Sequence, residues 1–281
     1  MYASFMRNPN PTTLLCVHPG MRDTLTGVDP TSTPGVAQRE DVSARTAENV
    51  ARIGELAQVL WADNRFSLLV VLQGMDTAGK DGVIRHVFAG IDPQGCRVTS
   101  FKRPSVEELS HDYLWRVHAA CPPRGSVGVF NRSHYEDVGV VRVHKRISRE
   151  ICEARYRQIN EFERHLVENG TRVVKFFLHI SKAEQKERLL TRIRDPLKGW
   201  KMEEADLAER RRWRAYMKVY SEAIEHCSTN AAPWYVIPAD KKWYRDFAVS
   251  AIVRGVLEGM KLRVPVKRLD RTRLERALQG R

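Results

Sequence analysis

The chain has 281 residues, of which 42% are hydrophobic and 29% are charged, and its formal net charge is +13. This length is sufficient for one large domain with a sizeable core. No apolar stretch reaches the length of a membrane span, and the first residues lack the basic-then-apolar pattern of a secretory leader, so we expect a cytoplasmic protein that does not enter a membrane. The five cysteines are scattered and form no C-x-x-C pair, which predicts reduced thiols rather than disulfides or a zinc site.

The basic excess is concentrated in two segments. Residues 261–281 carry eight basic and two acidic side chains, and residues 186–218 carry eleven basic and six acidic ones. The first is typical of a solvated C-terminal tail, whereas the second lies inside the body of the chain and favours a polyanionic partner. Residues 1–35 are rich in Pro, Thr, Asn and Gly, which predicts a loosely ordered extension over about 1–40.

Helices and strands alternate along the chain. An amphipathic helix at 42–62 leads into the apolar run 68–72, which suits a strand buried on both faces. The later predicted elements are a helix from Gly82, a strand at 96–101, a helix at 105–120, a strand at 126–130, a helix at 148–169, a strand at 171–180, helices at 181–194 and 203–226, a strand at 234–237 and a helix at 240–260. This alternation predicts an α/β fold, a parallel sheet with helices on both faces.

A glycine-bracketed loop follows the buried strand. Residues 74–82 read Gly-Met-Asp-Thr-Ala-Gly-Lys-Asp-Gly and match the first seven positions of the phosphate-loop pattern G-x-x-x-x-G-K-[ST]. Strand, loop and helix in this order let backbone N–H groups and a lysine converge on an anion, whereas the alternative is a glycine-rich turn that only caps a helix. The predicted phosphate contacts of this region are Gly74, Ala78, Gly79, Lys80, Asp81, Gly82 and Arg85.

The last position of the pattern carries a carboxylate instead of a hydroxyl. Asp81 stands there, and Asp76 is a second acid inside the loop. Two acids in an anion-binding loop would repel the ligand unless a hard divalent cation lies between them, so we expect Mg²⁺, with Mn²⁺ as an alternative. For Asp81 the competing interpretation is that it only favours the positive end of the following helix.

Charged side chains also follow other strands. At 131–137, Asn-Arg-Ser-His-Tyr-Glu-Asp offers Arg132 as a bidentate phosphoryl clamp and Glu136 as a magnesium ligand, although a surface turn with an ordinary ion pair has the same composition. Lys102 and Arg103, after the strand at 96–101, are candidates for an acceptor phosphate by position alone. All of these strands should end at one sheet edge, where ligands bind in such folds.

The basic segment 186–218 contains a loop with the features of a lid. A proline and a glycine bracket a loop at 195–199, and we expect its cations to fold over phosphates and exclude water. These cations are Arg192, Arg194, Lys198 and Lys201. On the next helix, Arg211 lies on a basic face that is either solvated or in contact with a long polyanion, and the opposite aromatic face is expected in the core.

Several motifs in this order and spacing resemble the family-2 polyphosphate kinases. They are GMDTAGKDG, FKRPSVEELSHDYLWR, FNRSHYEDV, RDPLKGWK and, at 234–242, WYVIPADKK. The resemblance covers about residues 45–260 and implies a fold similar to thymidylate kinase, a phosphate-loop core under an arginine-rich helical lid. Members of this family move a phosphoryl group between inorganic polyphosphate and a nucleotide, in either direction and with Mg²⁺.

The resemblance implies a role for each matching residue. A kinase domain would span 41–260 with a lid at about 192–215, followed by a basic tail at 261–281. Many members have Asp where this chain has Asn131, and the FNRS form is similar to members that accept both nucleoside mono- and diphosphates. We therefore expect adenine and guanine nucleotides as acceptors and a homo-oligomer, a dimer or a tetramer. The implied roles are Asp76, Lys80 and Arg132 in catalysis, Asp76 and Glu136 at the metal, and Arg192, Arg194 and Lys198 in the lid.

Two other functions share parts of this pattern. An ATP-dependent nucleoside monophosphate kinase would have the same loop and lid, and only the phosphoryl donor distinguishes it. A nucleic-acid-binding module would explain the net charge, but no DNA- or RNA-binding motif is present and we expect no nucleic acid as partner. A polyphosphate donor accounts better for a basic excess that extends over many residues.

Overall fold

The computed structural model describes residues 11–36, 39–197, 199–265 and 271–279. Within these residues, a six-stranded sheet has the strand order β1-β6-β5-β2-β4-β3. Strands β2 to β6 run parallel and β1 pairs antiparallel with β6. The strands are β1 (Cys16–Val17), β2 (Ser67–Gln73), β3 (Cys96–Ser100), β4 (Val127–Asn131), β5 (Thr171–His179) and β6 (Trp234–Pro238). The predicted parallel sheet is confirmed, with one antiparallel edge strand added.

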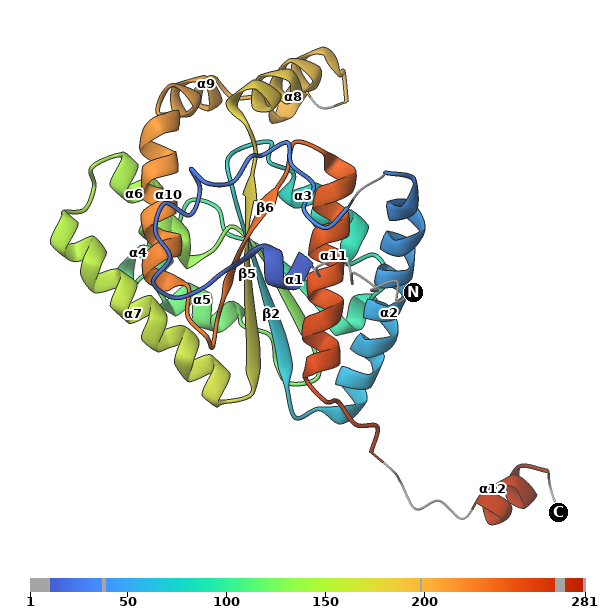
Figure 1. The fold of residues 1–281 in the computed structure, drawn as a ribbon. Coiled ribbons are helices and arrows are strands. Elements are labelled where there is room, and N and C mark those ends of the chain that lie inside the picture. Colours follow the sequence, from blue (N-terminus) through green and yellow to red (C-terminus); the bar gives the residue numbers. More distant parts are fainter. Residues whose placement is uncertain (1–10, 37–38, 198, 266–270, 280–281) are drawn as a thin grey trace, which may run out of the picture.

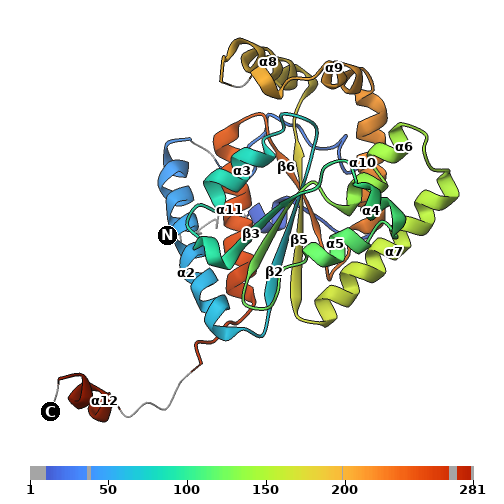
Figure 2. The same ribbon diagram turned by 180° about the vertical axis from the view of Figure 1, so that it is seen from behind.

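Helices cover both faces of this sheet (Figures 1 and 2). One layer holds α2 (Glu40–Asp63), α3 (Lys80–Val87) and α11 (Lys242–Gly259), and the other holds α7 (Arg149–Glu168) and α10 (Trp213–Cys227). Above the carboxyl ends of the strands lie α8 (Lys182–Arg194) and α9 (Glu204–Arg211). The remaining helices are α1 (Pro11–Leu14), α4 (Val106–Ser110), α5 (Trp115–Ala120), α6 (Val140–Val143), α12 (Arg271–Leu278) and the 3₁₀ turns Pro93–Gly95, His134–Asp137 and Gly199–Lys201.

Burial explains why β2 is the central strand. All seven residues of β2 are buried, as an apolar run covered by helices on both faces requires. The amphipathic helix predicted from Val42 is observed as α2, and it buries Val42, Ile53 and Leu60. On α10 the predicted aromatic face packs inward, with Tyr216 and Tyr220 buried.

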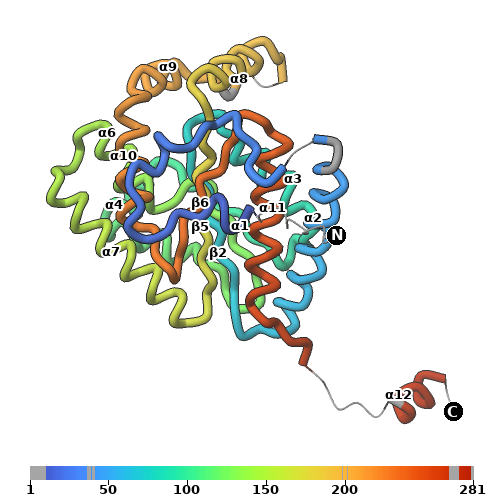
Figure 3. Tube along the Cα trace, in the orientation of Figure 1, coloured from blue at the N-terminus to red at the C-terminus, as the bar shows by residue number. Residues whose placement is uncertain are grey.

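The N-terminal segment differs from the sequence prediction. Residues 11–36 were expected to be loosely ordered, but they pack along β6 and α10 (the blue tube in Figure 3). Leu15 and Val17 are buried, and the backbone N–H of Val236 donates to the carbonyl oxygen of Leu15. The composition of this segment is typical of loops, but a few apolar side chains reach the core and one short strand pairs with the sheet edge.

Two predicted helices are each divided in the structure. The predicted helix 105–120 consists of α4, with Ser105 as its capping box, and α5, because the chain turns at His111. The predicted helix 203–226 breaks near Arg212 into α9 and α10. In the described part of the tail, α12 lies away from the body (Figure 1), and no helix of the described residues is long and apolar enough to cross a membrane. None of the five cysteines, all within the described residues, forms a disulfide in the structure.

Candidate active site

The phosphate loop connects β2 to α3, and its backbone requires glycine at both ends. Gly74 has a φ of +148° and Gly79 a φ of +107°, a region that favours glycine. A Cβ atom would lie 2.8 Å from the carbonyl oxygen of Leu178 at Gly74 and 1.8 Å from Nη1 of Arg245 at Gly79. Between them Thr77 has a φ of +64°, which is strained for a β-branched residue. The loop is therefore held in one conformation by its surroundings.

Lys80 is the first residue of α3, and its side chain reaches back across the loop. Its Nζ donates to the carbonyl oxygens of Gly74, at 2.7 Å, and Met75, at 3.3 Å. Burial and the nearby charge of Arg132 lower the pKa of Lys80, and the surrounding carboxylates oppose this shift. The ammonium group is thus a point charge that is already placed inside the concave side of the loop.

The sheet register brings a second loop to the same place. Leu72 of β2 pairs with Asn131 of β4, and the backbone N–H of Arg132 donates to the carbonyl oxygen of Leu72. The side chains then bridge the two loops: Arg132 Nη2 lies 2.9 Å from Asp76 Oδ1 and Asn131 Nδ2 lies 2.8 Å from Asp81 Oδ1. An aspartate at position 131 would face Asp81 with a like charge, whereas the amide donates a hydrogen bond.

Four charged side chains, Lys80, Arg132, Asp76 and Glu136, lie together where β2 and β4 end. Burial disfavours the charged form of Arg132, but the charges of Glu136 and Asp76 outweigh it and raise the pKa of Arg132. For Glu136 burial is the larger effect and raises the pKa above its ordinary value of 4.5, while Arg132 and Lys80 oppose the shift. Two cations and two carboxylates are therefore within electrostatic range of each other.

The donor set fits a hard divalent cation only in part. Asp76 and Glu136 offer carboxylate oxygens, which suit Mg²⁺, but the described residues contain no group of three or more His, Cys, Asp or Glu side chains arranged to hold a metal. Mg²⁺ commonly keeps several waters and takes substrate phosphate oxygens as ligands. Two carboxylates beside a phosphate loop are sufficient for that type of site.

A buried polar cluster supports the turn that carries Arg132 and Glu136. Glu163 of α7 accepts from Tyr135 Oη at 2.9 Å and lies 3.2 Å from His134 Nε2. Lys175 of β5 donates to Glu163, to Tyr135 Oη at 2.9 Å and to the carbonyl oxygen of Cys227 at 2.7 Å. Lys175 and Glu163 are fully buried, so their charges compensate each other and fix the His134–Asp137 turn against the sheet.

The other described residues of the predicted site lie on α3, α8 and α9 and directly after β3. Lys102 and Arg103 are exposed just after β3, whose Ser100 pairs with Asn131. Arg85 is exposed on α3, and Arg192, Arg194 and Arg211 lie in the last turns of α8 and α9. Within the described residues, none of these six side chains forms a hydrogen bond or ion pair with residues 74–82. Lys198 lies outside the described residues, and the side chain of Lys201 is also not described.

Three residues at this site were not predicted. Gln185 and Arg188 of α8 donate to carbonyl oxygens of the phosphate loop, and Arg245 of α11 packs behind Gly79. The sequence predicted the helix that carries Gln185 and Arg188, but no local pattern indicates that it lies beside the loop. That placement depends on the pairing of β2 with β5.

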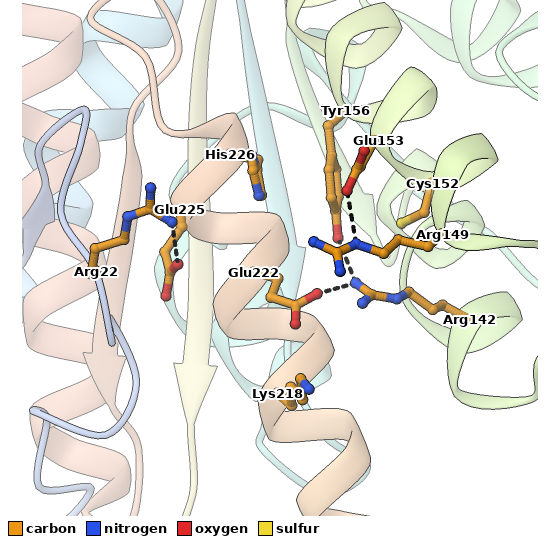
Figure 4. Close-up of a pocket in the computed structure, with 10 residues that line it drawn as sticks. All are labelled: Arg22, Arg142, Arg149, Cys152, Glu153, Tyr156, Lys218, Glu222, Glu225 and His226. Atoms are coloured by element: carbon orange, nitrogen blue, oxygen red, sulfur yellow. Dashed lines mark hydrogen bonds and ion pairs between the residues drawn. The ribbon is translucent and has the colours of Figure 1, made fainter.

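A separate pocket lies between α7 and α10 (Figure 4). Its volume is about 370 Å³. Three ion pairs line it, namely Arg142 with Glu222, Arg149 with Glu153 and Arg22 with Glu225. Because these charges compensate one another, the pocket has little positive excess for a polyanion, and no predicted phosphate or metal contact lines it.

The fold and the loops at the strand ends define an α/β protein of the phosphate-loop kinase class. The model of the Polyphosphate kinase 2 (PPK2) family matches residues 36–265, and the chain belongs to this family. An AMP/ADP-polyphosphate phosphotransferase of Meiothermus ruber is 51% identical over 214 residues, which cover 76% of this chain and 80% of that protein. An ADP-polyphosphate phosphotransferase of Rhodopseudomonas palustris is 48% identical over 228 residues, covering 77% and 79%. The crystal structure of polyphosphate kinase 2 from Arthrobacter aurescens TC1 superposes with a TM-score of 0.92 at 46% identity and covers 97% of both chains. The predicted family and fold are confirmed.

Proposed function

We propose that this chain is a polyphosphate-dependent nucleotide kinase, which transfers the terminal phosphoryl group of inorganic polyphosphate to ADP or GDP and also to AMP or GMP. The observation that supports this proposal is the meeting of Lys80, Arg132, Asp76 and Glu136 where β2 and β4 end. The relatives named above act on polyphosphate and adenine nucleotides, and their similarity extends over the segments that carry these residues.

The reaction forms one phosphorus–oxygen bond and breaks another. An oxygen of the nucleotide's terminal phosphate attacks the terminal phosphorus of polyphosphate, and the shortened polyphosphate leaves with the bridging oxygen. The attacking oxygen is already ionised near neutral pH, so no general base is required. Catalysis then depends on alignment and on compensation of the charge on the transferred group.

The residues at the sheet edge supply that charge. Lys80 would turn from the loop carbonyls to the phosphates, and Arg132 would clamp the transferred group from the opposite side. The N–H groups of residues 74–82 complete the cradle. On substrate binding, Arg132 would exchange its ion pair with Asp76 for phosphoryl oxygens, and the Asp76 carboxylate would then be available to hold the cation.

Asp76 and Glu136 would hold Mg²⁺, or Mn²⁺, through carboxylate oxygens. The cation supplies charge compensation between these two acids and the phosphates when it is bound. Asp81 already accepts a hydrogen bond from Asn131 and lies on the exposed side of α3, so we assign it to the orientation of the loop.

The lid would contribute to the binding of the polyphosphate chain. Burial raises the pKa of Asp206 on α9, the charge of Asp76 in the phosphate loop raises it further, and the charge of Arg192 on α8 lowers it. The α8–α9 pair therefore stands near the loop and carries its cations there. Polyphosphate affinity should weaken steeply as salt increases, by analogy with counterion release from nucleic acids.

The test is a coupled assay with the purified chain. We expect ATP from ADP, and ADP and ATP from AMP, when Mg²⁺ and polyphosphate are supplied, and no product when EDTA removes the metal. Replacing polyphosphate by ATP with AMP as acceptor distinguishes an ordinary nucleoside monophosphate kinase. Sedimentation of the same preparation measures whether it forms the expected dimer or tetramer. A folded preparation that makes no nucleotide from polyphosphate would refute the proposal.

A further inference from the structure

Helix α8 holds the back of the phosphate loop. Three consecutive carbonyl oxygens of the loop accept hydrogen bonds from two side chains of this helix. Gln185 Nε2 donates to Asp76 at 3.1 Å, and Arg188 Nη1 donates to Thr77 at 2.9 Å and to Ala78 at 3.1 Å. Gln185 is 2% exposed and the side chain of Arg188 is 10% exposed, so water competes little for these bonds.

The same arginine also holds a second loop. Arg188 Nη2 donates to the carbonyl oxygens of Ala239, at 2.7 Å, and Asp240, at 2.8 Å, where β6 leads into α11. Its Nε donates to Glu184 at 2.8 Å. All five N–H donors of the guanidinium group therefore have an acceptor, and its planar shape spans two loops from one helix.

Fixing these carbonyl groups also fixes the N–H groups on the other side of the chain. A peptide unit is planar, and its C=O and N–H groups point in opposite directions. The carbonyl groups of Asp76 and Ala78 belong to the peptide units that carry the N–H groups of Thr77 and Gly79. In the described part of the chain neither of these N–H groups donates a hydrogen bond, whereas that of Ala78 donates to Met75 at 3.0 Å. Two N–H groups thus remain to meet an anion.

The contact also connects the loop to the lid. Arg210 of α9 donates to Gln185 Oε1 at 2.7 Å and to the carbonyl oxygen of Lys182 at 2.8 Å. Asp240 accepts from the backbone N–H of Ser181, the cap of α8, at 2.7 Å. The first turns of α8 are therefore tied to α9, to the phosphate loop and to the start of α11, while its last turn carries Arg192 and Arg194.

We propose that Gln185 and Arg188 are positioning residues. They orient the phosphate-loop N–H groups and hold the lid helix α8 in a defined position relative to the loop. They need not touch the substrate. The strained backbone at Thr77 supports this assignment, because a β-branched residue keeps a positive φ only where its neighbours hold it. The inference rests on the assignment of residues 74–82 as the phosphate cradle.

The variants Arg188→Met, Arg188→Lys and Gln185→Leu test this inference. Arg188→Met removes every hydrogen-bond donor of the side chain at nearly constant volume. We expect kcat/KM to fall about 100-fold, which is the typical loss in rate when a catalytic group is misplaced. Arg188→Lys keeps the charge but donates from one atom and cannot span both loops, so we expect an intermediate loss. Hydrogen exchange of the Ala78 amide, which donates to Met75 inside the loop, should accelerate in each variant, while exchange within β2 stays unchanged.

Arg254→Met is the matched control. Arg254 forms hydrogen bonds with Glu48, Asn49 and Glu258 where α11 meets α2, away from the loop. Its loss should therefore leave the reaction rate and the hydrogen exchange of the loop as in the wild type.

The cradle assignment is tested before the variants, by calorimetry of tripolyphosphate binding to the wild type and to Lys80→Met. If the wild type does not bind, or Lys80→Met binds equally well, the cradle assignment fails and the inference fails with it. If the cradle holds but Arg188→Lys and Gln185→Leu match the wild type in rate and exchange, only the positioning role is refuted. These two smaller changes decide the question even if Arg188→Met does not fold.

Discussion

The buried Lys175–Glu163 pair should be essential for stability, and Lys175→Met tests this directly. The variant keeps the volume of the side chain and removes its charge and its three hydrogen bonds. Lys175 is 0% exposed and Glu163 is 1% exposed, so the remaining carboxylate would have no compensating lysine and no water. Breaking a buried pair in this way typically costs about 3–5 kcal/mol. For a chain of this size we expect the melting temperature to fall by roughly 10 °C.

The pH dependence should change sign in this variant. Burial alone would raise the pKa of Glu163, but Lys175 and His134 lower it below its ordinary value of 4.5. The wild type therefore gains stability from this group above pH 4.5 and loses it as the pH falls through the lowered pKa. Without Lys175 burial dominates and the folded-state pKa lies above the unfolded one. The variant should then be least destabilised at acid pH and lose stability as the pH rises.

Urea unfolding of four proteins measures how much the Lys175–Glu163 pair contributes to the free energy of unfolding. They are the wild type, Lys175→Met, Glu163→Gln and the double variant, and we expect the double variant to be more stable than the sum of the single losses predicts. Arg164→Met on the same helix is the control, because its pair with Glu168 is exposed and should contribute less than about 1 kcal/mol. A Lys175→Met protein that loses under about 1 kcal/mol, or strictly additive single variants, would refute this account of the cluster.

Three further predictions concern the active site itself. Lys80→Met should lower turnover by about 10² to 10³, the usual effect of removing one group that stabilises developing charge, and a folded variant with near wild-type turnover contradicts its role. Gly79→Ala should abolish tripolyphosphate binding in calorimetry, since its Cβ would lie 1.8 Å from Nη1 of Arg245 at a φ of +107°; unchanged affinity would show that the loop tolerates another conformation. Because burial raises the pKa of Glu136 above 4.5, Mg²⁺ activation should weaken as the pH falls toward that raised pKa. The Glu136→Gln variant should need more Mg²⁺ at every pH and should lack this pH dependence. Identical pH profiles for the two proteins would exclude Glu136 as a ligand.

The sequence by itself determined the local features of this protein. The apolar run of β2, the glycines at 74 and 79 and the lysine at 80 each follow from requirements of neighbouring residues, namely burial on two faces, positive φ and an anion-binding turn. Ser105 and Ser181 likewise cap the helices that follow them through residues only three positions away: Ser105 and Glu108 form a complete capping box, and the Glu184 N–H donates to the Ser181 side chain. Such signals depend on a few neighbouring residues and can be read without knowledge of the fold.

Only the tertiary structure decided which distant residues meet at the site. The pairing of β2 with β4 brings Arg132 to Asp76. The pairing of β2 with β5 brings α8 behind the loop, so that Arg188 reaches the carbonyl groups of Thr77 and Ala78, which are more than 100 residues away in sequence. The N-terminal strand and the buried Lys175–Glu163 pair were missed for the same reason. Their stability comes from burial and from long-range partners, and neither quantity is a property of a short segment.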